Sequence, residues 1–301
     1  MPVQTAPRAT SKTLSVGTKS QHEATPAPLR YRCQRADLGR NLVSTIMEAR
    51  AQLGKDNVDT RGYLILTTDV VLNSSDMEEI LRTAKEDKTK YVYGFHISSK
   101  MTGYLEAHVD NTVSLDIQPT LDSNWSNSDA HDSESDFQAW VDQPVQKVRY
   151  LIGPPWIQDH FGNHLLSAGS SMERRQPIPG VNQPYWYLSL DAHTPASVHI
   201  EDANTGSANI LLYGADKQWQ IIHPASAEKF EKCIREEFRQ SKNCTQFVRH
   251  HNIILSPTWL RERGILFEIE HQRAGEIFCT MPGRVYHAVS NTGCNFAIAQ
   301  N

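Results

Sequence analysis

The sequence predicts a mainly β fold preceded by a mixed α/β region, and two features of its pattern support this. From Val148 onward, short apolar runs are separated at close spacing by Gly, Pro, Asn and Asp, as all-β sandwiches and barrels require. Before that point, apolar residues at helical spacing occur on both sides of a β-type run, which is typical of an α/β region. With 301 residues, the chain is long enough for one large domain or two small ones.

The N-terminal region contains two predicted helices with a strand between them. Apolar residues recur at helical spacing over Leu38–Leu53, and a second helix is predicted over Asp76–Ala84 with Ser75 as its cap. The run Tyr63–Val71 has the composition of a strand. No recognisable chemical motif lies in this region, so it either binds a partner or supports the β domain.

Two helices are predicted to interrupt the β-rich part of the chain. The first runs from Pro224 to Asn243, where apolar side chains fall three or four residues apart or side by side. The second runs from Pro257 to Arg263 and ends at Gly264, since glycine is suited to the C-terminus of a helix. Both are expected as insertions between strands.

Two stretches are expected to lie outside the packed core. Residues 1–29 form a polar tail whose first 22 residues are basic and free of acids; a transit peptide would share this composition, but a disordered tail is the preferred interpretation. The acid-rich run DSNWSNSDAHDSESD is expected to be solvated, with the holding of a basic peptide as the alternative. The predicted division is a tail (1–29), an α/β region (30–121), an acidic linker or loop (122–141) and a β domain (142–301).

Composition excludes several classes of protein. Charged residues make up 21% of the chain and the formal net charge is −4, so no direct nucleic-acid partner is predicted. The five cysteines are odd in number and scattered, which argues against a secreted disulfide framework and for a reducing compartment. No run approaches the roughly 18 apolar residues of a membrane span, so no membrane partner is predicted.

His199 and Glu201 are the first candidates for chemistry, because they stand two residues apart in an apparent strand. Alternate residues of a strand leave the same face, so one ion can contact both side chains. A third ligand must come from another strand, and His287 follows a β-rich run and a Pro-Gly turn. Two imidazoles and a carboxylate on one side of a metal form the facial triad of non-haem Fe(II) oxygenases. Since His-x-Glu pairs also occur by chance, this hypothesis depends on the surrounding residues.

Two hairpin turns are predicted after this pair, at Asn204–Gly206 and Gly214–Asp216, and are expected to return the next strands across the same sheet. Asn209 opens the first returning strand and Lys217 the second. A 2-oxoglutarate molecule that chelates iron needs a fixed cation and an amide or hydroxyl for its far carboxylate. Lys217 and Asn209 are candidates for these groups, although a lysine beside a turn can equally be an ordinary exposed residue.

Residues 180–301 resemble the JmjC domain of lysine demethylases, especially the subfamily that also carries a JmjN segment. The counterparts occur in the same order: PGVNQPYWY, VHIED, the spacing of Asn209 and Lys217, Trp219, CTQFVRH, ILSPTWLRERGI and QRAGEIFCTMPGRVYHAVSNTGCNFA. Ordered agreement of this kind is far more specific than any single motif. The resemblance implies that the β domain is a double-stranded β-helix, that is, a cupin-like jelly roll.

The resemblance also implies roles for individual residues. His199, Glu201 and His287 would bind Fe(II), and Asn209 and Lys217 would bind 2-oxoglutarate. The cofactors would supply the oxidation, while the protein would supply positioning and electronics.

Further roles are implied for residues upstream of the triad. Tyr150 is the candidate for a tyrosine that helps to hold 2-oxoglutarate, but Ile152 aligns as readily with that position. Gly180, Tyr185 and Tyr187 would line a methyl-lysine channel, in which polar oxygens face the polarised methyl groups. The alternative is that the two tyrosines, as alternate residues of a strand, fill a core.

Cys244 and His250 match the first two ligands of a structural zinc site in the same subfamily. The two later cysteines of that site have no counterpart before Asn301, and structural zinc takes four ligands. Zinc is therefore not expected, and whether this pair binds any metal is left open.

By resemblance, the expected reaction uses O₂ to hydroxylate a C–H bond. On an N-methyl group the product is an unstable hemiaminal that releases formaldehyde, so the first hypothesis is a demethylase of methyl-lysine in histone tails. Such a chromatin regulator would act in the nucleus, and a cytoplasmic location is the alternative. Because fold and metal site do not fix the substrate, a hydroxylase of a protein side chain or small molecule is a second hypothesis. A catalytically silent chromatin scaffold is a third, against which the complete triad argues.

Overall fold

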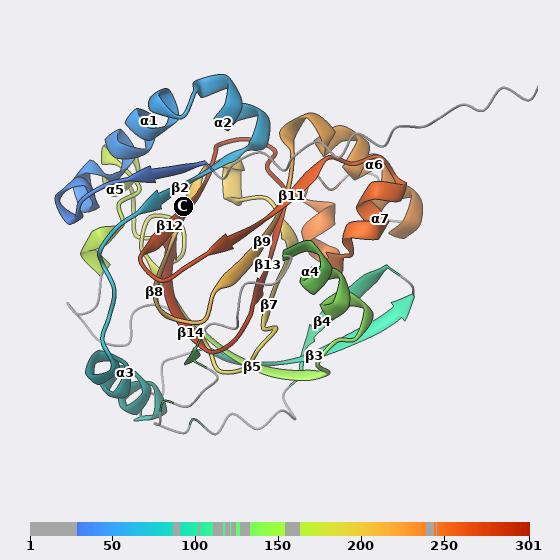
Figure 1. Cartoon of the computed structure of the whole chain (residues 1–301), viewed down its shortest axis with the longest axis horizontal. Helices are drawn as coiled ribbons and strands as arrows, with labels where there is room; N and C mark the ends of the chain where they lie inside the picture. The colour runs from blue at the N-terminus through green and yellow to red at the C-terminus, as the bar shows by residue number, and fades with distance from the viewer. Residues whose placement is uncertain are drawn as a thin grey trace, which may run out of the picture.

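The computed structural model describes residues 29–86, 91–101, 103–110, 117, 121, 125–126, 133–153, 163–238, 244 and 246–301. The expected tail, apart from Leu29, lies outside the described residues, as do most of residues 122–132 and the end of the helix predicted to reach Asn243. In the described part, two β-sheets form the centre and helices cover them (Figure 1), which confirms the mainly β prediction. No helix in this part is both long enough and apolar enough to cross a membrane.

The larger sheet contains ten strands and the smaller sheet four. In spatial order, the larger sheet consists of β1 (Arg30–Arg32), β2 (Tyr63–Thr67), β12 (Glu276–Thr280), β8 (Ser207–Gly214), β14 (Asn295–Gln300), β6 (Tyr185–Ser189), β5 (Lys147–Gly153), β3 (Tyr91–Met101), β4 (Tyr104–Val109) and β10 (Ile253–Leu255). The smaller sheet consists of β11 (Phe267–Gln272), β9 (Lys217–Ile222), β13 (His287–Asn291) and β7 (Pro195–His199). Trp219 of β9 stacks on Phe278 of β12 with ring centroids 4.2 Å apart, so the two sheets face each other across a packed interior.

The turns after β7 and β8 carry the chain from one sheet to the other, so the expectation of hairpins within one sheet was wrong. β7 lies in the smaller sheet, β8 in the larger and β9 again in the smaller. The first turn is a 3-10 turn over Asp202–Asn204, and at the second turn Gly214 has a φ of +93°. A Cβ at Gly214 would lie 2.4 Å from the carbonyl oxygen of Cys294, so only glycine permits this bend. Strands that alternate between two facing sheets are those of a jelly roll.

Both helices expected in the N-terminal region are present. They are α1 (Leu42–Gln52) and α3 (Ser74–Glu86), and the structure adds α2 (Lys55–Arg61) between α1 and β2. The cap of α3 is Asn73, not Ser75: Asn73 Oδ1 accepts the Asp76 N–H at 3.0 Å, and Asp76 Oδ2 accepts the Asn73 N–H at 2.9 Å. This reciprocal pair satisfies backbone donors that the first turn of a helix leaves free.

The inserted helices pack together on the outside of the smaller sheet. They are α6 (Ala227–Phe238), which follows a 3-10 turn over Pro224–Ser226, and α7 (Pro257–Glu262), which ends before Gly264 as expected. A 3-10 turn over Phe247–His251, designated η7, lies between them in the chain. A single turn, α5 (Ser170–Glu173), precedes β6. The buried side chains that hold the insertion to the barrel include Phe230, Ile234, Phe247, Trp259 and Tyr286.

The acid-rich segment expected to be a linker contains a packed helix, α4 (Ser133–Asp142). Its face buries Phe137, Trp140 and Val141 against β3–β5 and β10. The expectation of a loop was wrong for this helix because it weighed the acids of the segment and overlooked three apolar residues at helical spacing just after them. The domain boundaries drawn around the segment stay a prediction.

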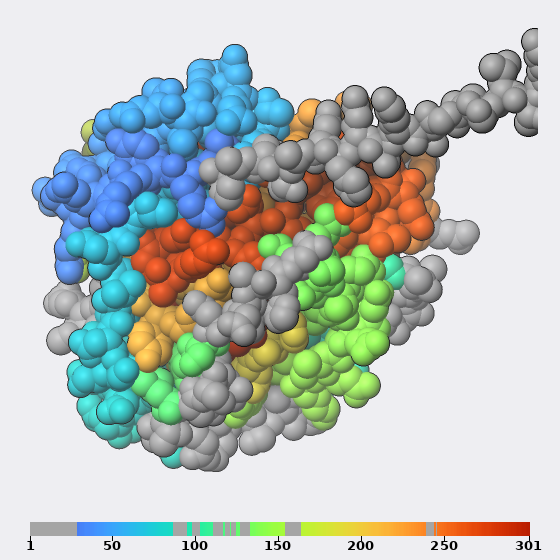
Figure 2. Space-filling view, viewed as in Figure 1, coloured from blue at the N-terminus to red at the C-terminus, as the bar shows by residue number. Residues whose placement is uncertain are grey.

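The N-terminal region is joined directly to the barrel. β2 pairs antiparallel with β12, and Figure 2 shows the blue N-terminal residues lying against the orange-red C-terminal ones. Arg61 donates to Glu268 of β11, and the Tyr63 hydroxyl lies 2.8 Å from Glu268 and 3.0 Å from Glu270. These residues form a buried polar cluster between the region and the barrel, which we call the Arg61 cluster (Arg61, Tyr63, Glu268 and Glu270).

Candidate active site

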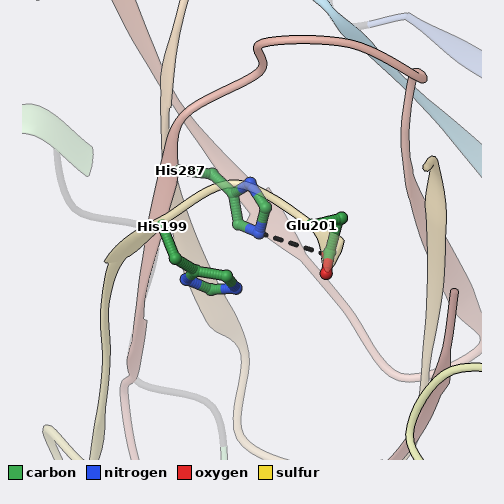
Figure 3. Close-up of side chains that lie close together, drawn as sticks. All are labelled: His199, Glu201 and His287. Atoms are coloured by element: carbon green, nitrogen blue, oxygen red, sulfur yellow. Dashed lines mark ion pairs between the residues drawn. The ribbon is translucent and has the colours of Figure 1, made fainter. Parts of the chain in front are cut away.

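Three predicted metal ligands meet at one end of the smaller sheet. His199, the last residue of β7, is directly opposite His287, the first residue of β13, and their ring centroids are 4.3 Å apart. Glu201 lies two residues beyond β7 on extended backbone, and its Oε1 is 3.5 Å from His287 Nε2 (Figure 3). One possible ligand atom from each residue lies within 4.8 Å of those of the other two. Among the described residues, these three form the one group of at least three possible metal ligands that lie this close together.

The backbone fixes the orientation of both imidazoles. His199 Nδ1 lies 2.7 Å from the Ser197 carbonyl oxygen, and His287 Nδ1 lies 3.1 Å from the Val285 carbonyl oxygen. Because a carbonyl oxygen only accepts, each Nδ1 must carry the proton, and each Nε2 presents a lone pair. Two lone pairs and a carboxylate therefore converge on one point, which is the arrangement that a cation stabilises.

The charges of the site favour its metal-binding form. Burial, with the nearby His287, lowers the pKa of His199 to about 4, so this imidazole is neutral at pH 7. Burial opposes ionisation of Glu201, but its interactions with the His287, His199 and Ser207 side chains outweigh burial and lower its pKa to about 2. Metal ligands must be deprotonated, and both groups are deprotonated at neutral pH.

The strand register places the other predicted cofactor residues in the same interior. In the larger sheet, Asn209, Ala299 and Tyr185 form one row across β8, β14 and β6 and therefore share a face. Phe278 continues this row and stacks on Trp219, so the face points toward the smaller sheet.

Register also aligns the residues of the smaller sheet. His287, Val289 and Asn291 are alternate residues of β13. In the pairing of β13 with β9, Val289 is opposite Trp219 and Asn291 is opposite Lys217. Alternate residues of a strand share a face, so Lys217 and the metal ligands point into the same interior. The structure therefore brings the triad, Lys217 and Asn209 together, although they come from both sheets.

Lys217 is a buried cation without a counter-ion. Its side chain is 1% exposed, and in the described part of the chain no carboxylate or hydrogen-bond acceptor contacts the ammonium. Its neighbour is the Tyr187 ring, whose centroid lies 5.7 Å from Nζ. Burial lowers the pKa of Lys217 to about 7. The exposed-lysine alternative is excluded, and an anionic ligand would supply the missing partner.

Asn209 also has unused hydrogen-bonding capacity. It is 8% exposed, and its Oδ1 is buried without a partner in the described residues. Rotation of the amide exchanges its oxygen and nitrogen, so the side chain can offer a donor to the same ligand. A buried cation and a buried amide that both lack partners fit the far carboxylate of 2-oxoglutarate.

The predicted channel residues lie beside this interior. Tyr185 and Tyr187 are half-buried, whereas Trp186 between them is fully buried and packs edge-on against Phe296, so the core position is that of Trp186. Burial, followed by the charge of Glu201, raises the pKa of Tyr187, which indicates that Tyr187 lies close to the triad. Gly180 has a φ of +82°, and a Cβ there would lie 3.5 Å from the Tyr185 ring.

Tyr150 and Ile152 both lie on β5 but differ in surroundings. Tyr150 is buried with its ring centroid 6.0 Å from that of Tyr187, and burial raises its pKa. Its hydroxyl lies near the side chain of Asn291, the residue opposite Lys217. Ile152 is opposite Tyr187 but offers no polar group. Of the two candidates for the position that helps to hold 2-oxoglutarate, the geometry favours Tyr150.

Sequence reasoning did not identify the residues that support these side chains. Ser207 lies near the Glu201 carboxylate, and its Oγ is 2.8 Å from Thr280 Oγ1. Asn291 lies near Tyr150 and hydrogen-bonds Asn295 and Thr194. Their partners come from distant parts of the chain, so no local pattern could have revealed them.

Cys244 and His250 lie close together but apart from the triad. Cys244 Sγ is 3.9 Å from His250 Nδ1, and within the described residues no third possible ligand joins them. The pair therefore remains two of the four ligands that structural zinc requires.

The C-terminal part of the chain is similar to known proteins. The family model described as "JmjC domain, hydroxylase" matches residues 187–301. Over 125 residues, which are 41% of its length, this chain is 39% identical to probable lysine-specific demethylase 4F of Homo sapiens and to lysine-specific demethylase 4D of Rattus norvegicus. Over the same length it is 37% identical to lysine-specific demethylase 4B of Mus musculus.

The matched stretch covers 19%, 24% and 11% of these relatives' own lengths, in the same order. The triad, Asn209 and Lys217 lie within the matched residues, whereas Tyr150, Gly180 and Tyr185 precede them. Residues 187–301 are thus similar to the JmjC domain, hydroxylase family model, and this part of the chain is similar to proteins named lysine-specific demethylases.

Proposed function

We propose that this protein is an Fe(II)- and 2-oxoglutarate-dependent dioxygenase that demethylates N-methyl-lysine in histone tails. The observation that supports this most is the meeting of a His–Glu–His triad with a buried, unpaired lysine and amide in one interior. The similarity to proteins named lysine-specific demethylases supports the substrate class. A histone substrate would place the protein in the nucleus.

Each side chain of the interior has a proposed task. His199, Glu201 and His287 would hold the metal on one side and leave the opposite positions for 2-oxoglutarate and O₂. With 2-oxoglutarate and O₂ bound, Fe(II) would supply the oxidation of a C–H bond. Lys217 would donate N–H groups to the far carboxylate of 2-oxoglutarate, together with Asn209.

The substrate side is proposed for the larger sheet. Tyr150 would place its hydroxyl beside the 2-oxoglutarate site, near Asn291. Tyr185 and Tyr187, with Gly180 against the Tyr185 ring, would line the approach of the methylated side chain. Their oxygens suit methyl groups that a neighbouring cationic nitrogen polarises.

Mass spectrometry of histone peptides tests the proposal. Dimethyl- and trimethyl-lysine peptides are incubated with the protein, Fe(II), 2-oxoglutarate and ascorbate, and succinate is measured in the same samples. We expect mass losses of one methyl group or more in at least one peptide, and no loss with His199→Ala. His108→Ala is the matched control, because His108 is 48% exposed on β4 and pairs with Glu106 outside the triad.

Two other outcomes contradict parts of the proposal. Succinate formation that depends on His199 while every peptide stays unchanged would reject the demethylase and leave a hydroxylase of another substrate. If no succinate forms with any of the peptides, the oxygenase activity is rejected and the scaffold hypothesis is favoured.

A further inference from the structure

The segment that carries Glu201 is not held by a strand ladder. β7 ends at His199, and the chain then makes a 3-10 turn in which Ala203 and Asn204 have φ values of 53° and 55°. Left-handed backbone is uncommon for residues other than glycine, so this conformation persists only where its surroundings impose it. The position of the Glu201 carboxylate therefore depends on contacts made by its neighbours.

Arg249 makes these contacts on both sides of Glu201. Its Nη2 donates to the carbonyl oxygen of Ile200 at 2.7 Å, and its Nη1 donates to Asp202 Oδ1 at 2.6 Å. Ile200 lies between the two ligands of the His-x-Glu pair, and Asp202 follows Glu201. One planar guanidinium thus fixes the residue before and the residue after a metal ligand, which a point charge such as lysine reproduces poorly.

The turn that presents Arg249 is itself anchored. Phe247 and Val248, the first residues of η7, are 0% and 2% exposed. The guanidinium of Arg235, on α6, lies 3.6 Å from the centroid of the Phe247 ring and donates to the Cys244 carbonyl oxygen at 3.3 Å. Arg249 therefore reaches the Glu201 turn from a fixed support on the inserted helices.

Exposure argues that this contact does not serve global stability. The Arg249 and Asp202 side chains are 38% and 56% exposed, and ion pairs that are exposed to this degree contribute little to folding. An arginine that makes two short hydrogen bonds at the ligand turn, yet adds little stability, has a local task.

We propose that Arg249 is a positioning residue that sets the Glu201 carboxylate for metal binding, so that the α6–η7 insertion controls the affinity of the triad for a divalent cation. The proposal rests on the proposed function, because it takes the triad to be the metal site. The hydrogen bonds of Arg249 go to Ile200 and Asp202 and not to a side chain of the triad. Groups that orient metal ligands change metal affinity by roughly 10- to 100-fold when they are removed.

Titration of the whole chain with Co(II) alone tests the proposal, with visible absorption as the signal for affinity and ligand geometry. Arg249→Met keeps the length of the side chain but removes both donors, and we expect about tenfold weaker Co(II) binding or more, with an altered spectrum. Arg249→Lys should recover part of the affinity, and Asp202→Asn should weaken binding less than Arg249→Met because the Ile200 contact remains. Melting temperatures should stay within a few degrees of the wild type.

Arg263→Met is the matched control. Arg263, just after α7, also makes a partly exposed ion pair, with Glu237 at 2.8 Å, but its hydrogen bonds go to Glu237 and Trp259 and not to the Glu201 turn. Its substitution should leave Co(II) affinity and spectrum unchanged. Equal losses of affinity in Arg249→Met and Arg263→Met would overturn the proposal, and so would a folded Arg249→Met protein with wild-type Co(II) binding.

If Arg249→Met does not fold, the Co(II) affinities of Arg249→Lys and Asp202→Asn test the proposal instead. Wild-type Co(II) affinity in both variants overturns it. His199→Ala separates this result from a failure of the proposed function. If the His199→Ala variant binds Co(II) as tightly as the wild type does, the triad is not the metal site, and the Arg249 proposal fails with it. Binding that requires His199 but not Arg249 rejects the Arg249 proposal alone.

Discussion

Lys217 is the residue whose environment most constrains the proposed chemistry. A buried ammonium without an acid destabilises the ligand-free fold, since its charged form is desolvated and uncompensated. We therefore expect Lys217→Met to raise the free energy of unfolding at pH 7 by roughly 2–4 kcal/mol in the absence of 2-oxoglutarate. The same substitution should weaken 2-oxoglutarate binding roughly 10- to 100-fold, because a charged hydrogen-bond partner is lost.

The pH dependence of stability provides an independent measure. Burial lowers the pKa of Lys217 from 10.5 to about 7, so between these values the unfolded chain binds more protons than the folded chain at this residue. The free energy of unfolding should therefore rise with pH from about 7 to 10 through this group, and the rise should be smaller in Lys217→Met. Denaturant titrations at several pH values measure it, with exposed Lys232→Met as control. A Lys217→Met protein that is less stable than wild type would contradict this account.

Asn182 organises the loop that carries Gly180. Its Oδ1 accepts the Ile178 N–H at 2.6 Å, and its Nδ2 donates to the carbonyl oxygens of Gln176 at 2.9 Å and Met172 at 3.1 Å. Asn182→Ala should release the loop and raise KM for the peptide substrate severalfold, with kcat little changed and a stability loss of about 1–2 kcal/mol. Steady-state kinetics on the peptide found by mass spectrometry measure the effect. Asn41→Ala removes one exposed hydrogen bond elsewhere and serves as control; equal KM values in both variants would be evidence against a channel at Gly180.

At this scale, sequence predicted what local spacing encodes. His199 and Glu201 could be identified because a two-residue step in extended chain puts both on one face. The roles of Ser207, Asn291 and Arg249 could not, because each depends on a partner that only folding brings near. Supporting residues of a site are therefore harder to predict than its ligands.

At the scale of elements, the Arg61 cluster joins α2 and β2 to β11. Arg61 and Glu268 are 5% and 11% exposed, and the Tyr63 hydroxyl and His223 Nε2 also contact Glu268. Removing one charge of a buried pair leaves the other without compensation. Glu268→Gln should therefore lower the free energy of unfolding by about 2–4 kcal/mol, and chemical denaturation measures it.

The acid limb of the stability curve should change in the same variant. Burial disfavours the Glu268 carboxylate, but hydrogen bonds to His223 and Arg61 outweigh it and lower its pKa to about 2. The stability it contributes is complete above its usual pKa of 4.5 and is lost as the pH falls toward 2. Glu268→Gln should lack this loss. Glu262→Gln, at a 69% exposed side chain, should behave as wild type, and an equal effect in both variants would show that the cluster contributes nothing specific.

Several helices and strands were predictable, whereas α2, α4 and the partners of the strands were not. The position of α7 and its end before Gly264 followed from capping residues and the glycine that follows. The turns at Asp202–Asn204 and Gly214–Asp216 could not be assigned to one sheet or two, because a bend in the chain has the same local sequence in both cases. Only the resemblance to a jelly-roll family indicated the correct outcome.

At the scale of the whole molecule, the larger sheet combines strands from the predicted α/β region and from the predicted β domain. β2 adds to the edge of β12, and β3 and β4 lie between β5 and β10, so residues before 142 supply strands to both sides of the barrel sheet. The sequence predicted only one of these strands, over Tyr63–Val71, and assigned residues 30–121 to a separate α/β region, because strand pairing at long range leaves no periodic signal. Their function as part of the barrel sheet follows from the topology alone.

This topology predicts that residues 142–301 do not fold as an independent domain. Without the first 141 residues, β12 loses β2, β10 loses its partner β4, and Glu268 and Glu270 lose Arg61 and Tyr63. Unpaired strand edges and uncompensated buried acids favour aggregation over folding. Purified 142–301 should show no cooperative thermal transition by circular dichroism and no saturable Co(II) binding, whereas the full chain shows both. A cooperative transition with Co(II) binding in the fragment would instead mean that the predicted boundary at residue 142 separates true domains, and that β1–β4 are an addition to a barrel that is stable without them.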